Sequence, residues 1–384
     1  PGSAIGFDPS HIALRDIRMG IDSVMYYGRD MNAVIREFSM YERSGLSVTS
    51  LTGRLFADST VIRIPSLKLL TPHSEMNFTA QTYWELINIP TTGRLTARFN
   101  ARIGKQDVLL FAGGLPETFK EAYPFRPLVI HAGTEGNLKQ MQISRFTAEL
   151  PGAFSLNGGG EFWNLTDSVK RNGNMDFEMH TQNLNFLTGL ADIAPDGSII
   201  VPDSMHLAAR VGMEGTQCTA ALKLLEKEGV LNLDAAYNLA TEAYHADLAI
   251  NNLQVHHFLP KDSIYTLTAK MSAKGQGVDV ASRKTVAALN ASLEKLQYGH
   301  WDISGVEAHA GLKSSVATVR LASDNVLLKM QGNADMRLDR SYLDGALDLN
   351  VEEVNLHKLG LVPRPLKHPF AFTMGAEARH DSLK

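Results

Sequence analysis

The chain has 384 residues, which is longer than a single compact domain usually is, so two or three domains or one elongated repeat architecture are expected. A hydrophobic content of 44% and a charged content of 20% exclude a disordered chain. The net charge of −4 gives no electrostatic reason to expect a nucleic-acid partner. The single cysteine, Cys218, excludes an internal disulfide.

An eight-residue pattern with a skipped beat, apolar-x-apolar-x-x-apolar-x-apolar, begins at residue 12 and recurs along the chain. In a regular strand, residues two apart share a face, so a step of three would turn the second half onto the other face. A bulge at the polar pair inserts one extra residue and restores the face. The pattern therefore predicts bent strands with one apolar face. The residues expected to line that face are Ile12, Leu14, Ile17, Met19, Ile62, Ile64, Leu67, Leu69, Met141, Ile143, Phe146, Met179, Leu184, Phe186, Leu248, Ile250, Leu253, Val255, Leu296, Tyr298, Trp301, Ile303, Leu349, Val351, Val354 and Leu356.

Helical patterns are rare. The segment 30–44 has an apolar stripe at Met31, Val34, Ile35 and Phe38, which predicts an amphipathic helix, and a second short helix is expected within 106–122. Period-two segments separated by turn signals fill most of the rest. We therefore expect a mainly β fold. A soft boundary near 190–205 divides it into segments 1–190 and 191–384, and the chain reads as an excised piece of a longer protein.

Motifs for catalysis and cofactor binding are missing from the sequence. It contains no nucleophile elbow, no phosphate loop, no H-E-x-x-H and no C-x-x-C. The pair His256–His257 and the later His357 follow two copies of the pattern, but no carboxylate or cysteine stands at ligand spacing, so no metal site is predicted. We expect no enzyme activity and no cofactor.

A tripeptide of Asp-Ser followed by an apolar residue or Thr occurs six times. It resembles the O-glycosylation signal that one group of Gram-negative anaerobes applies to exported proteins. The alternative is ordinary Asp-Ser turn and cap chemistry. If the signal is real, the modified residues are Ser23, Ser59, Ser168, Ser204, Ser263 and Ser382.

The stretches REFSMYERSGLSVTSLTGRL and IRIPSLKLLTPHSEMNF resemble the TamB (translocation and assembly module) family of the AsmA-like superfamily. The segment GTEGNLKQMQISRFTAELPGAFSLNGGGEFWNL fits the same family. The resemblance implies an elongated, curved antiparallel sheet folded into a U-shaped apolar groove, β-taco-like. It also implies a periplasmic protein, attached to the inner membrane through a missing N-terminal anchor, that passes phospholipid toward the outer membrane. An outer-membrane β-barrel assembly protein is the implied partner at one end.

Three alternatives stay open at this point. The apolar rows could instead pack against a second sheet as a dry sandwich. The protein could be an extracellular or surface adhesin or a carbohydrate-binding β-protein. A polysaccharide-degrading enzyme would need a convergent carboxylate pair, which the evenly spread acidic residues do not indicate.

Overall fold

The computed structural model describes residues 13–191, 197–280, 282–339, 342–368 and 370–380. Within these residues the fold is mainly β: 23 strands form one long, open antiparallel sheet, accompanied by a few short helices. This confirms the expected fold class. The chain divides into two compact units, residues 1–215 and 216–384, so the division falls after the expected range of 190–205.

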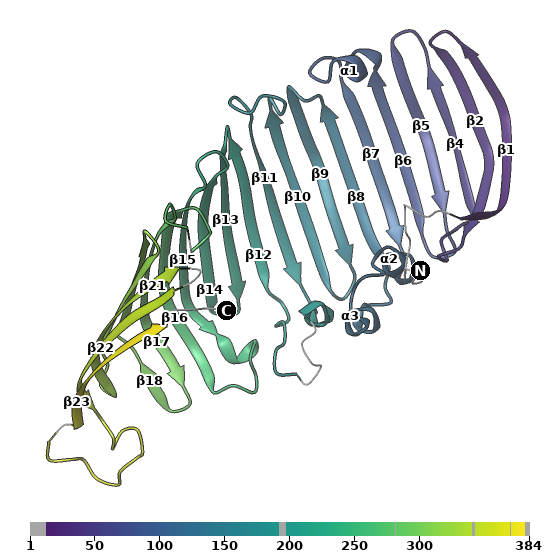
Figure 1. Ribbon diagram of the computed structural model, residues 1–384. Helices are drawn as coiled ribbons and strands as arrows, with labels where there is room; N and C mark the ends of the chain where they lie inside the picture. Colours follow the sequence, from purple (N-terminus) through teal and green to yellow (C-terminus); the bar gives the residue numbers. More distant parts are fainter. Residues whose placement is uncertain (1–12, 192–196, 281, 340–341, 369, 381–384) are drawn as a thin grey trace. The chain divides into compact units, whose positions relative to one another are not determined.

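The first unit is an antiparallel meander in which strands consecutive in sequence are neighbours in the sheet (Figure 1). Most connections are short turns, which is why the sheet can be built from local pairings. The strands are β1 Leu14–Tyr27, β2 Asp30–Glu42, β3 Ser47–Val48, β4 Ser50–Ala57, β5 Val61–Leu70, β6 Glu75–Tyr83, β7 Leu95–Ile103, β8 Leu128–Gly136, β9 Gln140–Leu150, β10 Phe154–Trp163, β11 Asn172–Thr181 and β12 His206–Glu214.

Short helices lie at the ends of the strands in this unit: α1, Trp84–Asn88, at one end, and α2, Lys105–Phe111, with α3, Glu117–Ala122, at the other (Figure 1). The helices α2 and α3 confirm the one expected within 106–122. Together with η1, Asn185–Ala191, they enclose a small hydrophobic cluster. Its buried members are Phe119, Tyr123, Leu150, Ala153, Leu184 and Phe186.

The second unit repeats the meander, with β18 forming a short hairpin on the end of β17. One 3₁₀ helix, η2, Val255–His257, follows β15. The strands are β13 Gln217–Glu226, β14 Gly229–Asn238, β15 Ala243–Gln254, β16 Ile264–Gln276, β17 Val286–Tyr298, β18 Trp301–Ile303, β19 Val306–Lys313, β20 Val316–Asp324, β21 Leu328–Asp339, β22 Tyr342–Val354 and β23 Phe370–His380.

The predicted helix over 30–44 is wrong: this segment is β2, which pairs with β1 and β4. The helical spacing has a different cause. Opposite Gly20 and Ile21, which are adjacent in β1, stand Glu37 and Ile35 of β2, so Arg36 is an extra residue. This bulge brings Phe38 onto the face of Ile35, and a three-residue step inside a strand looks like one turn of a helix.

No second sheet covers either unit in the part of the chain that the structure describes. All 23 strands belong to the one sheet, and most apolar side chains in mid-sheet are only half-buried. The buried hydrophobic cluster lies instead at the end of the strands of the first unit, beside α3 and η1. A dry sandwich core is therefore not the architecture of the described residues.

Candidate functional site: the apolar face of the sheet

Apolar side chains form continuous rows across the strands of the first unit. Residues paired across antiparallel strands point to the same face, so the register identifies each row. One row runs through Leu51, Leu69, Met76, Ala101, Ile130, Ala148, Leu156, Met179 and Leu207. The next runs through Gly53, Leu67, Phe78, Phe99, Ala132, Phe146, Gly158, Phe177 and Ala209. We call the side of the sheet that bears these rows the apolar face.

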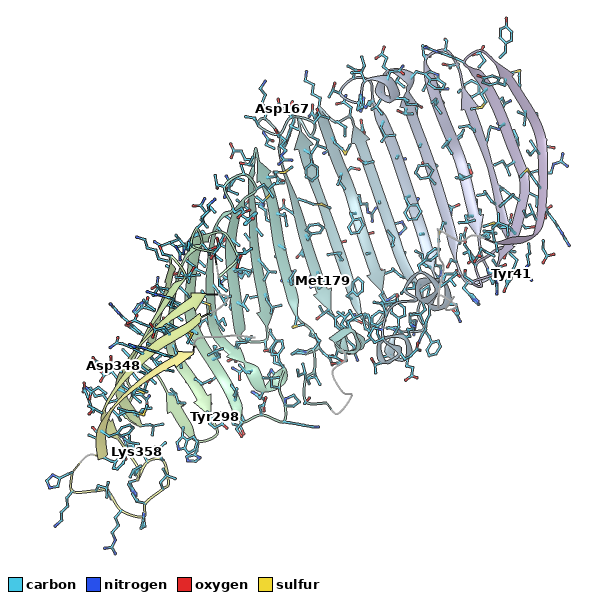
Figure 2. The ribbon with its side chains drawn as sticks, viewed as in Figure 1. Tyr41, Asp167, Met179, Tyr298, Asp348 and Lys358 are labelled. Carbon is cyan, nitrogen blue, oxygen red and sulfur yellow. The ribbon has the colours of Figure 1, made fainter. Side chains whose placement is uncertain are left out.

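The opposite side of the first unit, the polar face, carries charged and amide side chains. Lys68 Nζ lies 2.7 Å from Glu75 Oε1, and this hydrogen bond holds the pKa of the Glu75 carboxyl below its ordinary value. Arg210 Nε and Asp176 Oδ1 lie 2.6 Å apart on β12 and β11. In Figure 2 the sticks over the middle of the first unit are mostly carbon, with oxygen and nitrogen concentrated at the strand ends. The two faces therefore differ in chemistry from β4 to β12, where the rows run.

The apolar face is accessible rather than packed. Nearly every member of the two rows is half-buried, and only Ala101 and Ala148 are buried. Val211, on β12, is 47% exposed. An accessible apolar face is the feature that makes this side of the sheet the candidate binding surface.

The second unit has the same division. One row crosses it through Leu222, Leu233, Leu248, Met271, Ala291, Ala308, Leu321, Gly332, Leu349 and Met374. Met271 is 42% exposed and Met374 is 45% exposed, so this apolar face is also uncovered. Asp247, Asn290 and Arg320 lie on the opposite, polar side.

Five of the seven copies of the pattern are bulged strands, as predicted. Register shifts occur at each of them, and in two copies a non-glycine residue has a positive φ: Asp16 at 52° and Asn252 at 50°. The apolar residues that these copies bring to one face are Leu14, Ile17, Met19, Ile62, Ile64, Leu67, Leu69, Met141, Ile143, Phe146, Leu248, Ile250, Leu253, Leu349, Val351 and Val354.

The other two copies of the pattern are not bulged strands, and some of the predicted lining residues lie off the strands. In the copy at 179–186 only Met179 is on the strand face, because β11 ends at Thr181 and Leu184 and Phe186 enter the buried cluster. The copy at 296–303 is a tight turn between β17 and β18. Its members still share a face, since Leu296 pairs with Ile303 and Tyr298 with Trp301. Val255 is in η2, Leu356 follows the end of β22, and Ile12 is outside the described residues.

Much of the apolar face lies outside the copies of the pattern. Phe78 and Phe99 are in strands that alternate regularly and lack the skipped beat, and Phe177 precedes the copy that begins at Met179, so the pattern could not find them. The plain alternation in these strands is the signal that identifies them. Their alignment into one row follows from the register, which no single strand encodes.

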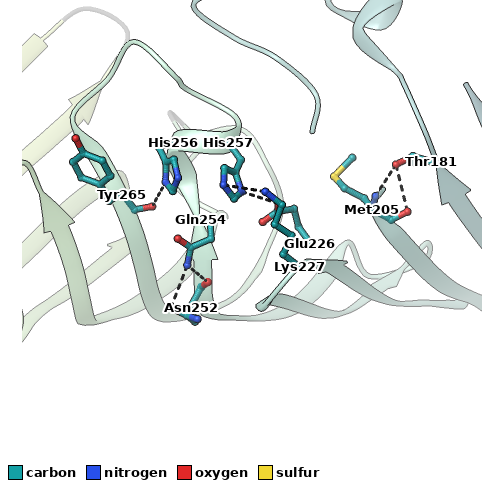
Figure 3. A network of polar contacts seen from close by, with 9 residues as sticks. All are labelled: Thr181, Met205, Glu226, Lys227, Asn252, Gln254, His256, His257 and Tyr265. Carbon is teal, nitrogen blue, oxygen red and sulfur yellow. Dashed lines mark hydrogen bonds and ion pairs between the residues drawn. The ribbon is translucent and has the colours of Figure 1, made fainter. Parts of the chain in front are cut away.

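The histidine pair at the end of β15 belongs to a network of polar contacts (Figure 3). His257 Nδ1 lies 2.8 Å from Oε1 of Glu226, a carboxylate that is fully buried. Lys227 Nζ lies 3.3 Å from the other ring nitrogen, and the His256 ring packs 4.2 Å from the His257 ring. His257 is therefore held by a carboxylate and a lysine, and His256 Nδ1 lies 3.4 Å from the backbone oxygen of Tyr265. His357 Nδ1 contacts the backbone oxygen of Val362 at 3.1 Å.

Five of the six candidate glycosylation sites are exposed, and Ser382 lies outside the described residues. Ser23 is in β1, and Ser59, Ser168, Ser204 and Ser263 are in turns and loops. Asp58 and Asp167 accept hydrogen bonds from the backbone N–H groups two and three residues further on, which is ordinary Asp-Ser turn chemistry. Glycosylation stays a prediction.

Comparison with protein-family models, with curated proteins and with solved structures gave no match. Among the described residues, no helix is both long and apolar enough to cross a membrane.

Proposed function

We propose that this chain is a non-catalytic scaffold that binds the acyl chains of phospholipids on its apolar face and lets them move along the rows. The observation that carries the proposal is the continuity of each row from strand to strand on a face that remains accessible. Strands are ~4.8 Å apart, so a row of nine strands extends for roughly 38 Å.

Energetics favour an acyl chain as the occupant. Exposing a palmitoyl chain to water costs on the order of 12 kcal/mol, at ~0.8 kcal/mol per methylene. As an acyl chain moves along a row, each of its methylenes passes from one apolar side chain to the next apolar side chain. The acyl chain can therefore move without being repeatedly exposed to water. The polar side chains at the strand ends leave a charged headgroup in contact with solvent.

The wider setting follows from the resemblance to the TamB family. We propose a periplasmic location, with inner-membrane attachment by a segment outside this chain, and transfer of phospholipid between the two membranes. Assistance to an outer-membrane β-barrel assembly protein is part of the same proposal. The accessible apolar face supports this setting because a lipid crossing an aqueous gap needs such a surface.

A carbohydrate-binding or adhesive role is the second candidate, and one observation favours it. The rings of Tyr298 and Trp301 are stacked with centroids 5.9 Å apart at the β17–β18 turn, and Tyr298 is 42% exposed. Paired aromatic faces of this kind suit stacking on sugar rings. The apolar rows, which extend far beyond this turn, favour lipid.

The test is titration of the lipid-stripped chain with a fluorescent phospholipid. Phe99→Glu places a charge in the middle of an apolar row, whereas Asn100→Glu places it on the polar face of the same strand. We expect saturable binding that Phe99→Glu weakens at least tenfold and Asn100→Glu leaves unchanged. Equal effects of the two substitutions, or no binding by the unmodified chain, would overturn the proposal.

A further inference from the structure

Two histidines and a glutamate converge on the polar face of the first unit, on the side of the sheet away from the apolar rows. Glu178 and His180 are two residues apart on β11, so their side chains share a face. The register pairs His180 directly with His206 of β12. Three side chains with metal-binding atoms therefore meet on two adjacent strands, although His180 and His206 are 26 residues apart in sequence.

The donor atoms of this cluster are already close together. Glu178 Oε1 lies 2.9 Å from His206 Nε2 and 3.6 Å from His180 Nε2. The two imidazole rings are stacked with centroids 4.4 Å apart and planes inclined by 10°. One atom from each of the three residues can be chosen so that all lie within 4.8 Å of one another.

These separations fit a small divalent ion. Zinc binds histidine nitrogen at about 2.0–2.1 Å and carboxylate oxygen at about 2.0–2.2 Å in a tetrahedron, which places neighbouring donors roughly 3.3–3.5 Å apart. The two measured separations from Glu178 Oε1 fall on either side of that range, so small rotations of exposed side chains suffice. Two imidazoles with one carboxylate select zinc, nickel or copper over magnesium and calcium, which prefer oxygen ligands alone.

The electrostatic surroundings also suit a cation. The other carboxylate close by on β11, Asp176, is paired with Arg210, so the charge available to an ion is that of Glu178. His206 is about one-third exposed and the other two ligands are more exposed. Solvent therefore reaches the cluster and can complete the coordination.

We propose that Glu178, His180 and His206 form a binding site for a divalent transition-metal ion of the zinc type. His180 Nε2, His206 Nε2 and Glu178 Oε1 are the protein ligands, and water takes the remaining position. Bound there, the ion ties β12, the last strand of the first unit, to β11. This site is on the face opposite the apolar rows and does not depend on the proposed lipid function.

The test is calorimetric titration of the full chain, free of affinity tags and chelators, with zinc chloride. We expect one ion per chain with a micromolar dissociation constant. Glu178→Gln and His206→Ala should each weaken binding at least tenfold. His245→Ala is the matched control, because His245 Nε2 lies 2.7 Å from Asp247 Oδ2 in a histidine–carboxylate pair for which the described part of the chain offers no third ligand.

Circular dichroism spectra of the variants establish that each is folded, as expected for exposed residues. A cobalt titration gives a second readout, because a tetrahedral nitrogen–oxygen site produces visible absorption bands that Glu178→Gln should remove. Two results would overturn the proposal. One is the absence of saturable binding by the unmodified chain; the other is binding that His206→Ala leaves unchanged, which would place the ion at other histidines.

Discussion

Ile64 and Leu67 are three residues apart in β5, yet both point to the apolar face. Their partners on β6, Ala80 and Phe78, are only two residues apart, so Pro65 and Ser66 occupy the space of one residue. The same register shift appears on the other side of β5, where Ser66 pairs with Arg54 and Arg63 with Phe56. The skipped beat in the sequence is thus a bulge that keeps one face apolar.

Deletion of Pro65 should be tolerated. It removes the extra residue and leaves Ile-Arg-Ile-Ser-Leu-Lys-Leu, which alternates regularly with every apolar side chain on its present face. Deletion of Thr79 from the regular strand β6 is the matched control. It turns half of that strand over, which we expect to cost about 3 kcal/mol or more in the free energy of unfolding. Urea denaturation of both variants measures the difference, and equal destabilisation would contradict the bulge as the reason for the spacing.

Gly160 should tolerate a side chain less well than its neighbour Gly159. A Cβ at Gly160 would clash with the backbone oxygen of Asn174 and lie 2.9 Å from Cα of Met175 on β11, whereas one at Gly159 would lie 3.1 Å from its nearest neighbour, the Ile143 oxygen. We expect Gly160→Ala to lower the free energy of unfolding by about 2 kcal/mol, because the backbone must shift. Gly159→Ala should cost less than half of that. Thermal denaturation compares the two, and the reverse order would show that the strands are not this close.

Removing the His257 side chain should be strongly destabilising. The buried carboxylate of Glu226 has Oε1 within 2.8 Å of His257 Nδ1, and its Oε2 has no protein hydrogen-bond partner among the described residues. His257→Ala would leave that carboxylate buried and unpaired, at a cost of about 3 kcal/mol. Adding Glu226→Gln should recover part of the loss, and His256→Ala serves as the control with a small effect. If His257→Ala had no effect on chemical denaturation, Glu226 would not depend on this partner.

Acid should weaken the turn that precedes β5. Hydrogen bonds from the Thr60 hydroxyl, and then from the Thr60 and Val61 N–H groups, lower the pKa of Asp58 below its ordinary value of 3.8. A carboxyl whose pKa is lower in the folded state stabilises the fold above the ordinary pKa. That stabilisation is lost as the pH falls through the folded-state value. Asp58→Asn should therefore flatten the dependence of unfolding free energy on pH below about 4, and an unchanged slope would contradict this role.

The sequence predicted the positions and apolar faces of individual strands better than the pairing between strands. Local alternation and the skipped beat identified strands such as β5, β9 and β15, because side-chain period and bulges are local properties. A bulge of the same kind in β2 led to the wrong prediction of a helix, because the extra residue Arg36 gives the apolar residues of that strand a helical spacing. The rows through Phe99 and Leu248, and the meeting of His180 with His206, depend on pairing between strands. A single strand does not encode that register, so these features emerge only in the folded chain.

Photo-crosslinking in cells from a benzophenone residue placed at Ile64, with Arg63 as the control, tests whether the apolar face binds lipid. Ile64 is half-buried on the apolar face, and Arg63 is exposed on the polar face of the same strand. Mass spectrometry of the purified chain then identifies what each position touches. Lipid binding on the apolar face predicts phospholipid adducts at Ile64 and none at Arg63. Adducts at both positions, or at neither, would contradict a lipid-binding apolar face.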